Sequence, residues 1–139
     1  MLSMGVFEGK YMNDCIFEFP KEWFIKALKK NKLSPEKANP LVNEFKIKSR
    51  LSLQEWRKRK WIKKGDPDVR GWFQWYCRYY LGRRDDKLDQ VQISRWRKFI
   101  RHKAQVIYDK KNPKSFELKK LHRPRQRQAL LQWAYYPYV

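Results

Sequence analysis

Residues 71–84, GWFQWYCRYYLGRR, place six aromatic side chains within nine positions and end in two arginines. At helical spacing these rings cover almost the whole circumference of the segment, and a helix with so little polar surface belongs inside a bundle. Cys77, in the middle of the run, then behaves as a small buried hydrophobe. The stretch predicts a core helix over residues 69–81, stopped by a left-handed cap at Gly82.

A second interpretation of the same rings is that they stack on nucleotide bases, as the aromatic residues of single-strand-binding surfaces do. The two interpretations differ in what Trp75→Ala should do. Loss of a core ring unfolds the domain, whereas loss of a stacking ring removes binding and keeps stability. The continuous ring surface favours the core.

Four further helices are expected around this segment. Pro20 suits the first turn of a helix over residues 20–32, and Ser52 with Glu55 forms a capping box that starts a helix over residues 52–61. An aspartate-rich start and a lysine-rich end suit the dipole of a long helix over residues 85–110. After a break at residues 112–113, a last helix runs from about Pro124 to Pro137.

The long helix has the clearest period, with an apolar arc around Trp96. Residues 1–19 are interpreted as an irregular arm or a short strand, and Phe45 with Ile47 could form one short strand or extended packing. The predicted fold is mainly α, a compact single domain over residues 1–139 with about five helices around a Trp/Tyr-rich helix and at most minor β structure. Residues 136–139 form a tail that either docks a partner or packs back. The arc comprises Leu88, Ile93, Phe99, Ile100, Ala104, Val106 and Ile107.

Charge is the strongest global feature. The chain of 139 residues carries 34 Lys and Arg against 14 Asp and Glu, a formal net charge of +20. Such a field attracts polyanions, so the candidate partners are nucleic acid, an anionic membrane surface or an acidic protein. No stretch approaches 18 apolar residues and the N-terminus has no continuous apolar core, which disfavours membrane insertion and secretion. Two lone cysteines, Cys15 and Cys77, suit a reducing compartment, so we expect an intracellular or virion-packaged protein.

Four basic clusters are candidates for phosphate contact. The face of the 85–110 helix opposite Trp96 carries basic residues and no acid, extended by Lys87, Gln90, Ser94 and Gln105. The others lie at helix ends or in loops, where arginine forks and helix amino termini bind phosphate oxygens. Any such face could also be ordinary solvated surface, and Arg127, only about 60° from Leu130 on the wheel, could pair with an internal acid instead. The predicted nucleic-acid-binding residues are Arg57, Lys58, Lys60, Lys63, Lys64, Arg83, Arg84, Arg97, Lys98, Arg101, His102, Arg123 and Arg125.

A catalytic site is hard to assemble from this sequence. His102 and His122 lack the Cys or His neighbours that zinc spacing needs, and there is no glycine-rich phosphate loop or nucleophile elbow. Five aspartates could hold a metal for phosphodiester cleavage, but helix caps and a turn explain them more simply. We expect no enzyme activity, cofactor or metal. The aspartates are Asp66, Asp68, Asp85, Asp86 and Asp89.

Five segments together resemble one protein family: FPKEWF (19–24), SRLSLQEW (49–56), GWFQWYCRYYLGRR (71–84), DQVQISRWRKF (89–99) and RQALLQWAY (127–135). The pattern is similar to that of hypothetical proteins from large DNA viruses, fungi and algae, over about residues 5–135, and its central motif is highly specific. The resemblance implies no activity or site residues. The family has one residue between Asp-Pro and Gly-Trp, whereas this chain has DPDVRGW, a longer turn that leaves the start of the helix open.

These features predict a small basic protein that binds nucleic acid, in the first place double-stranded DNA, through phosphate contacts with limited sequence specificity. A viral source would suit a genome-associated or virion-packaged role. Sequence-specific helix-turn-helix binding and single-strand or RNA binding are variants of this prediction. The alternative from another class is a structural or scaffolding protein with acidic protein partners, which exposed aromatic residues outside the core would favour.

Overall fold

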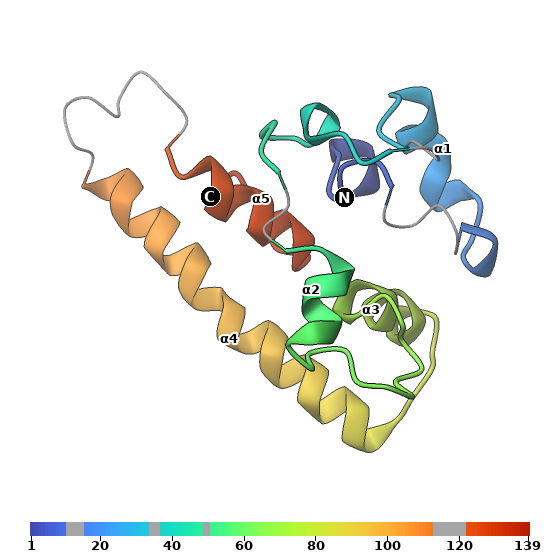
Figure 1. Ribbon diagram of the computed structural model, residues 1–139. Helices are drawn as coiled ribbons and strands as arrows, with labels where there is room; N and C mark the ends of the chain where they lie inside the picture. The colour runs from blue at the N-terminus through green and yellow to red at the C-terminus, as the bar shows by residue number, and fades with distance from the viewer. Residues whose placement is uncertain (11–15, 34–36, 49–50, 113–121) are drawn as a thin grey trace. The chain divides into compact units, whose positions relative to one another are not determined.

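The computed structural model describes residues 1–10, 16–33, 37–48, 51–112 and 122–139. These ranges contain five α-helices, three short 3-10 turns and no strand (Figure 1). The mainly α fold with an aromatic-rich core is therefore confirmed, and no strand forms at Phe45 or Ile47. The helices are α1 (Glu22–Lys29), α2 (Leu53–Lys58), α3 (Trp72–Tyr80), α4 (Asp86–Lys111) and α5 (Pro124–Gln132), and the turns are η1 (Leu2–Met4), η2 (Ile16–Glu18) and η3 (Pro40–Val42).

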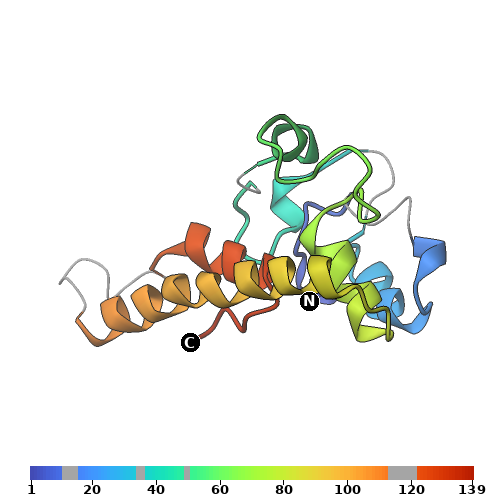
Figure 2. The same cartoon turned by 90° about the horizontal axis from the view of Figure 1, so that it is seen from below.

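The chain divides into two compact units. One comprises Met1–Ser49 with Ile100–Val139, and the other comprises Arg50–Phe99. The division falls within α4, which is one continuous helix (Figure 2). We call them the terminal unit and the central unit and describe each by itself. That the chain folds as a single domain stays a prediction.

The core of the central unit is built on α3. Trp72, Phe73, Trp75 and Cys77 are buried, and both tryptophans donate their indole N–H to α4. Trp72 Nε1 donates to the carbonyl of Gln92 at 3.2 Å, and Trp75 Nε1 donates to the Asp89 carboxylate at 2.7 Å. The core interpretation is confirmed for these residues, and their burial leaves them no surface for base stacking. Tyr80, at the end of the helix, is 69% exposed instead.

Two glycines set the bounds of α3. Gly71 has φ +80° and a non-helical ψ, so the helix begins at Trp72 rather than at residue 69. A Cβ on Gly71 would lie 3.1 Å from Ile62 Cδ1, so the site also favours glycine sterically. Gly82 has φ +103°, and the amides of Gly82 and Arg83 donate to the carbonyls of Tyr79 and Arg78. This is a Schellman motif, and the predicted stop at Gly82 is confirmed.

The start of α4 is capped by its own aspartates. The Leu88 amide donates to the Asp85 carboxylate at 3.0 Å, and the Asp85 amide donates to the Asp89 carboxylate at 2.9 Å. This reciprocal arrangement satisfies free amides at the start of the helix. At α2 the predicted cap is present on one side, where the Glu55 amide donates to Ser52 Oγ at 3.2 Å.

The buried side of α4 differs from the predicted apolar arc. Val106 is buried as expected, but Ile100 is 56% exposed, while Asp89 and Gln92 are buried. A buried indole N–H needs an acceptor, and Asp89 and the Gln92 carbonyl supply acceptors to the two tryptophans of α3. The hydrogen-bonding side of α4 therefore faces the core. Ala104, another member of the predicted apolar arc, is exposed and lies outside the core.

The terminal unit holds the irregular N-terminal residues firmly. The turn η1 packs against α1, and Gln128 of α5 donates through Nε2 to the carbonyls of Gly5 and Val6 at 3.1 and 2.9 Å. The Asn43 side chain accepts the Glu8 amide at 2.6 Å. Residues 1–10 are thus part of the packed unit. Its buried apolar residues are Leu2, Val6, Phe19, Phe24, Ala27, Val106, Leu130 and Leu131.

Helix α5 ends five residues before Pro137, earlier than predicted. Ala134 adopts a left-handed conformation with φ +57°, and the amides of Ala134 and Tyr135 donate to the carbonyls of Leu131 and Leu130. This is a Schellman motif without glycine, a conformation that alanine seldom adopts. The sequence therefore carried no signal for it.

The C-terminal tail packs back on the terminal unit. Arg127 is 3% exposed and donates to the carbonyls of His122 and Pro137 at 2.9 and 2.5 Å. It is internal, as one interpretation allowed, but these partners are carbonyl oxygens rather than an acid. Tyr138 donates to the Glu44 carboxylate and lies against the Phe45 ring. Burial, followed by the bond to Glu44, raises the pKa of Tyr138 to about 12.

Among the described residues, no helix is long and apolar enough to cross a membrane. Cys77 is a buried free thiol. Cys15 and the predicted break at Pro113 lie outside the described residues.

Candidate nucleic-acid interface

A polar and basic stripe runs along the exposed side of α4. We call it the α4 basic face, and all its members are exposed. They occupy an arc of about 100° on the helix, with Arg97 at one edge of the arc and Lys98 at the other. The sequence between Asp89 and Asp109 contains no acidic residue, so nothing on this stretch of helix offsets their charge. The α4 basic face comprises Lys87, Gln90, Ser94, Arg97, Lys98 and, on the next turn of the same helix, Arg101.

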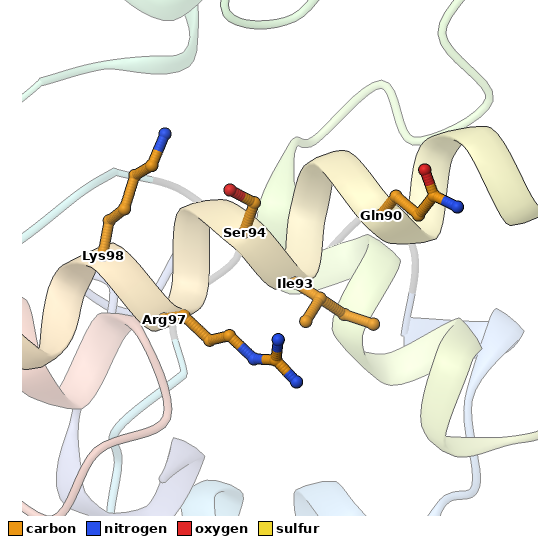
Figure 3. Close-up of a pocket in the computed structure, with 5 residues that line it drawn as sticks. All are labelled: Gln90, Ile93, Ser94, Arg97 and Lys98. Atoms are coloured by element: carbon orange, nitrogen blue, oxygen red, sulfur yellow. The ribbon is translucent and has the colours of Figure 1, made fainter.

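An open hollow lies along this face in the central unit. Gln90, Ile93, Ser94, Arg97 and Lys98 line it. Figure 3 shows Gln90, Ser94 and Lys98 projecting to one side of α4, with Ile93 and Arg97 projecting to the other. The two cations therefore lie together at one end of the hollow, and the Gln90 amide and Ser94 hydroxyl lie along the rest of it.

The cations of this face have no partner among the described residues. No hydrogen bond or ion pair there involves the side chain of Arg97, Lys98 or Arg101. Arg97 and Arg101 are four residues apart, a spacing at which like charges repel by a few tenths of a kcal/mol. Their charge is therefore available to an external anion. His102 is half-buried and has an interaction partner, so we leave it outside the α4 basic face.

A second exposed group lies at the end of α2 and in the loop after it. We call Lys58, Lys60, Lys63 and Lys64 the α2 loop lysines, and none has a side-chain partner in the described part of the chain. Arg57 is exposed too, but its guanidinium donates to the carbonyl of Val69 at 3.1 Å.

Arg83 and Arg84 are both bound by other residues of the central unit. The Asp68 carboxylate is 2% exposed and receives two bonds from Arg83, both 2.7 Å, and one from Arg78 at 2.9 Å. Arg84 lies 3.9 Å from the centre of the Tyr79 ring and donates to the Tyr79 carbonyl at 2.7 Å. The sequence had assigned Asp68 to a turn, and no local spacing links it to an arginine 15 positions later.

Arg83 and Arg84 also help to lower the pKa of Asp89. Burial alone would raise the pKa of this carboxyl, but the bonds from the Asp85 amide and Trp75, with the charges of Arg83 and Arg84, hold its pKa below the usual value. Asp89 is therefore an anion inside the core, stabilised by its hydrogen bonds.

In the terminal unit, Arg123 has side-chain partners, whereas Arg125 has none among the described residues. Arg123 forms an ion pair with Asp109 and donates to Gln126 Oε1 at 2.6 Å. Arg125 is exposed and has no partner among the described residues. Contact of any of these residues with nucleic acid stays a prediction.

The aspartates considered for metal binding have structural partners, Asp86 excepted. Asp66 accepts the Lys63 amide at 2.7 Å, while Asp68, Asp85 and Asp89 take part in the bonds described above. Within the described ranges, no three His, Cys, Asp or Glu residues gather closely enough to hold a metal. His122 Nε2 lies 3.1 Å from the carbonyl of Val106.

Comparison of the chain with protein families, curated proteins and solved structures finds no match.

Proposed function

We propose that this protein binds nucleic acid, in the first place double-stranded DNA, through its phosphate backbone and with limited sequence specificity. The observation that carries the proposal is the α4 basic face, where Arg97, Lys98 and Arg101 are exposed, lie on a stretch of helix without acidic residues and have no partner among the described residues. A phosphate backbone supplies regularly spaced anions, and neutralising it releases condensed counterions. The proposal includes no catalytic step.

The dimensions of the face suit a backbone. From Lys87 to Arg101 the helix rises about 21 Å at about 1.5 Å per residue. The same length of duplex spans roughly six base pairs at about 3.4 Å each. Arginine forks bind phosphate oxygens bidentately, and Gln90 and Ser94 can donate further hydrogen bonds. Such contacts position a duplex without reading its bases.

The α2 loop lysines support the same proposal. They add four unpaired cations in the central unit. Together with the α4 basic face they give enough charge to neutralise roughly six to ten phosphates.

Fluorescence anisotropy with a random-sequence duplex tests the proposal. With roughly six to ten phosphates neutralised, affinity should fall about 10³- to 10⁵-fold between about 50 and 200 mM salt. Absence of binding at the lower salt concentration, or an affinity indifferent to salt, would refute it.

Exposed aromatic residues favour a second candidate, a scaffolding protein that meets acidic protein partners. Phe17, Tyr80 and Tyr136 are strongly exposed, and aromatic side chains are enriched in protein interfaces. Poly-glutamate is a suitable competitor: if it displaces the duplex at equal charge concentration, acidic protein is the better partner, whereas the nucleic-acid proposal expects weak competition.

A role on a genome or in a virion would follow if the protein comes from a large DNA virus, as the resemblance of residues 71–84 suggests. Mass spectrometry of purified particles tests this part. Detection at a stoichiometry that scales with genome length supports genome association, and absence from particles excludes packaging.

A further inference from the structure

Trp61 is an exposed indole placed among cations. It is 42% exposed, more than Trp96 of α4 at 36%, whereas Trp72 and Trp75 of α3 are buried. The α2 loop lysines flank it on both sides in sequence. An exposed ring and several exposed cations therefore lie in one short segment.

The backbone fixes this ring in place. Lys60 adopts a left-handed conformation with φ +57°, and the amides of Lys60 and Trp61 donate to the carbonyls of Arg57 and Trp56 at 3.0 and 2.9 Å. This is a Schellman motif at the end of α2. The Trp61 carbonyl also accepts Arg95 of α4 at 3.3 Å.

Side chains orient the ring further. Trp61 meets Trp56 edge to face, with ring centres 5.4 Å apart. The Arg59 guanidinium lies 5.5 Å from the centre of the Trp61 ring and is held by Glu55 at 2.7 Å. A Schellman motif commonly brings an apolar residue at this position against the helix, and a leucine would satisfy that need. The motif does not account for a large indole with 42% of its surface exposed.

We propose that Trp61 is a stacking platform for an unpaired nucleobase, whose neighbouring phosphates are bound by the α2 loop lysines. Rings and cations are the combination that holds unpaired strands, since every base has a face to stack and every nucleotide a charge to neutralise. A paired base inside a duplex offers no free face. This inference rests on the proposed function and narrows it: the preferred substrate is nucleic acid with an unpaired base.

Three short duplexes test the proposal: one fully paired, one with a central unpaired adenine, and one with an abasic residue in place of that adenine. The abasic probe keeps the extra phosphate and the bend but lacks the base. Stacking should make the native protein bind the adenine probe about 5- to 100-fold more tightly than the abasic probe.

Trp61→Leu should bind all three probes alike, because it keeps the apolar contact and loses the stacking surface. Trp61→Phe should recover part of the preference, and Tyr80→Leu, an exposed ring without lysine neighbours, should keep all of it. Equal binding of the adenine and abasic probes by the native protein would overturn the inference, as would an undiminished preference in folded Trp61→Leu. If Trp61→Leu fails to fold, the two probes on the native protein still decide. Failure to bind any probe at low salt would instead refute the proposed function.

Discussion

The end of α3 and the exposed side of α4 are both rich in arginine, yet they use its charge in opposite ways. Arg78 and Arg83 converge on Asp68, a buried carboxylate. Arg97 and Lys98, in the same unit, lie on an exposed face with no described partner. The first group stabilises the fold, and the second leaves its charge available for a ligand.

The difference shows that a basic cluster in a sequence acquires its role from the nearest buried acid. GRR at residues 82–84 and RWRK at residues 95–98 look alike as sequence. Asp68 pairs with Arg83 of the first cluster, whereas Arg97 and Lys98 of the second have no described partner. If this view is right, variants of the two clusters should separate stability from binding.

Removing Asp68 should have the largest effect. Asp68→Ala leaves Arg78 and Arg83 without their carboxylate, and because both arginines are partly exposed we expect a loss of about 3 kcal/mol in the free energy of unfolding. Urea denaturation measures it. Asp86→Asn, which removes an exposed aspartate, should cost less than about 1 kcal/mol. A loss for Asp68→Ala no larger than this control would break the comparison.

Asp89→Asn should have an intermediate effect. The amide replaces an anion that accepts bonds from Trp75 and the Asp85 amide, and we expect a loss of about 1–3 kcal/mol at neutral pH. The pKa of Asp89 is lowered in the folded state, so its stabilisation is complete above the unfolded pKa near 4 and is lost as the pH falls through the folded pKa.

Chemical denaturation across the acid range checks the sign of this linkage. The gap in unfolding free energy between native protein and Asp89→Asn should be widest above about pH 5 and narrow below about pH 4. If the difference in unfolding free energy between the two proteins does not change with pH, ionisation of Asp89 is not linked to folding.

The helices could largely be predicted from local signals, because Ser52, Gly82 and the aspartates at the start of α4 act on the backbone beside them. Two features could not be predicted from local signals. Ala134 ends α5 by a conformation that its sequence does not encode. The buried side of α4 is set by the indole N–H groups of α3, which take their acceptors from this next helix.

For the candidate site, the sequence located the basic clusters but not their use. Arg83 and Arg97 have similar neighbours, and which of them is paired depends on Asp68, which the chain brings in from before α3. The sequence pattern places Trp61 only at the end of the predicted helix over residues 52–61. The left-handed turn at Lys60 ends α2 just before this ring, and a lysine seldom adopts that conformation.

The smallest effects are expected for the two arginines at the start of α5, which sharpen the comparison in the terminal unit. Arg123→Gln breaks a partly exposed ion pair with Asp109 and should cost about 0.5–1 kcal/mol of stability. Arg125→Gln should leave stability unchanged and weaken duplex binding slightly. Thermal melts paired with anisotropy distinguish them, and equal losses of stability in both variants would contradict the assignment.

The salt dependence of duplex binding by a triple variant tests the central claim most directly. Arg97→Gln, Lys98→Gln and Arg101→Gln together remove three charges from the α4 basic face. Lys26→Gln, Lys29→Gln and Lys30→Gln remove three exposed charges from α1 and its C-terminal cap as a matched control. Both sets lower the formal net charge from +20 to 20 − 3 = +17.

If the α4 basic face binds phosphates, the slope of log K against log salt should become shallower by about 2.7 for the first set. It should change by much less for the α1 set. Equal slopes for the two variants would show that only net charge matters, and the assignment of binding to α4 would then be wrong.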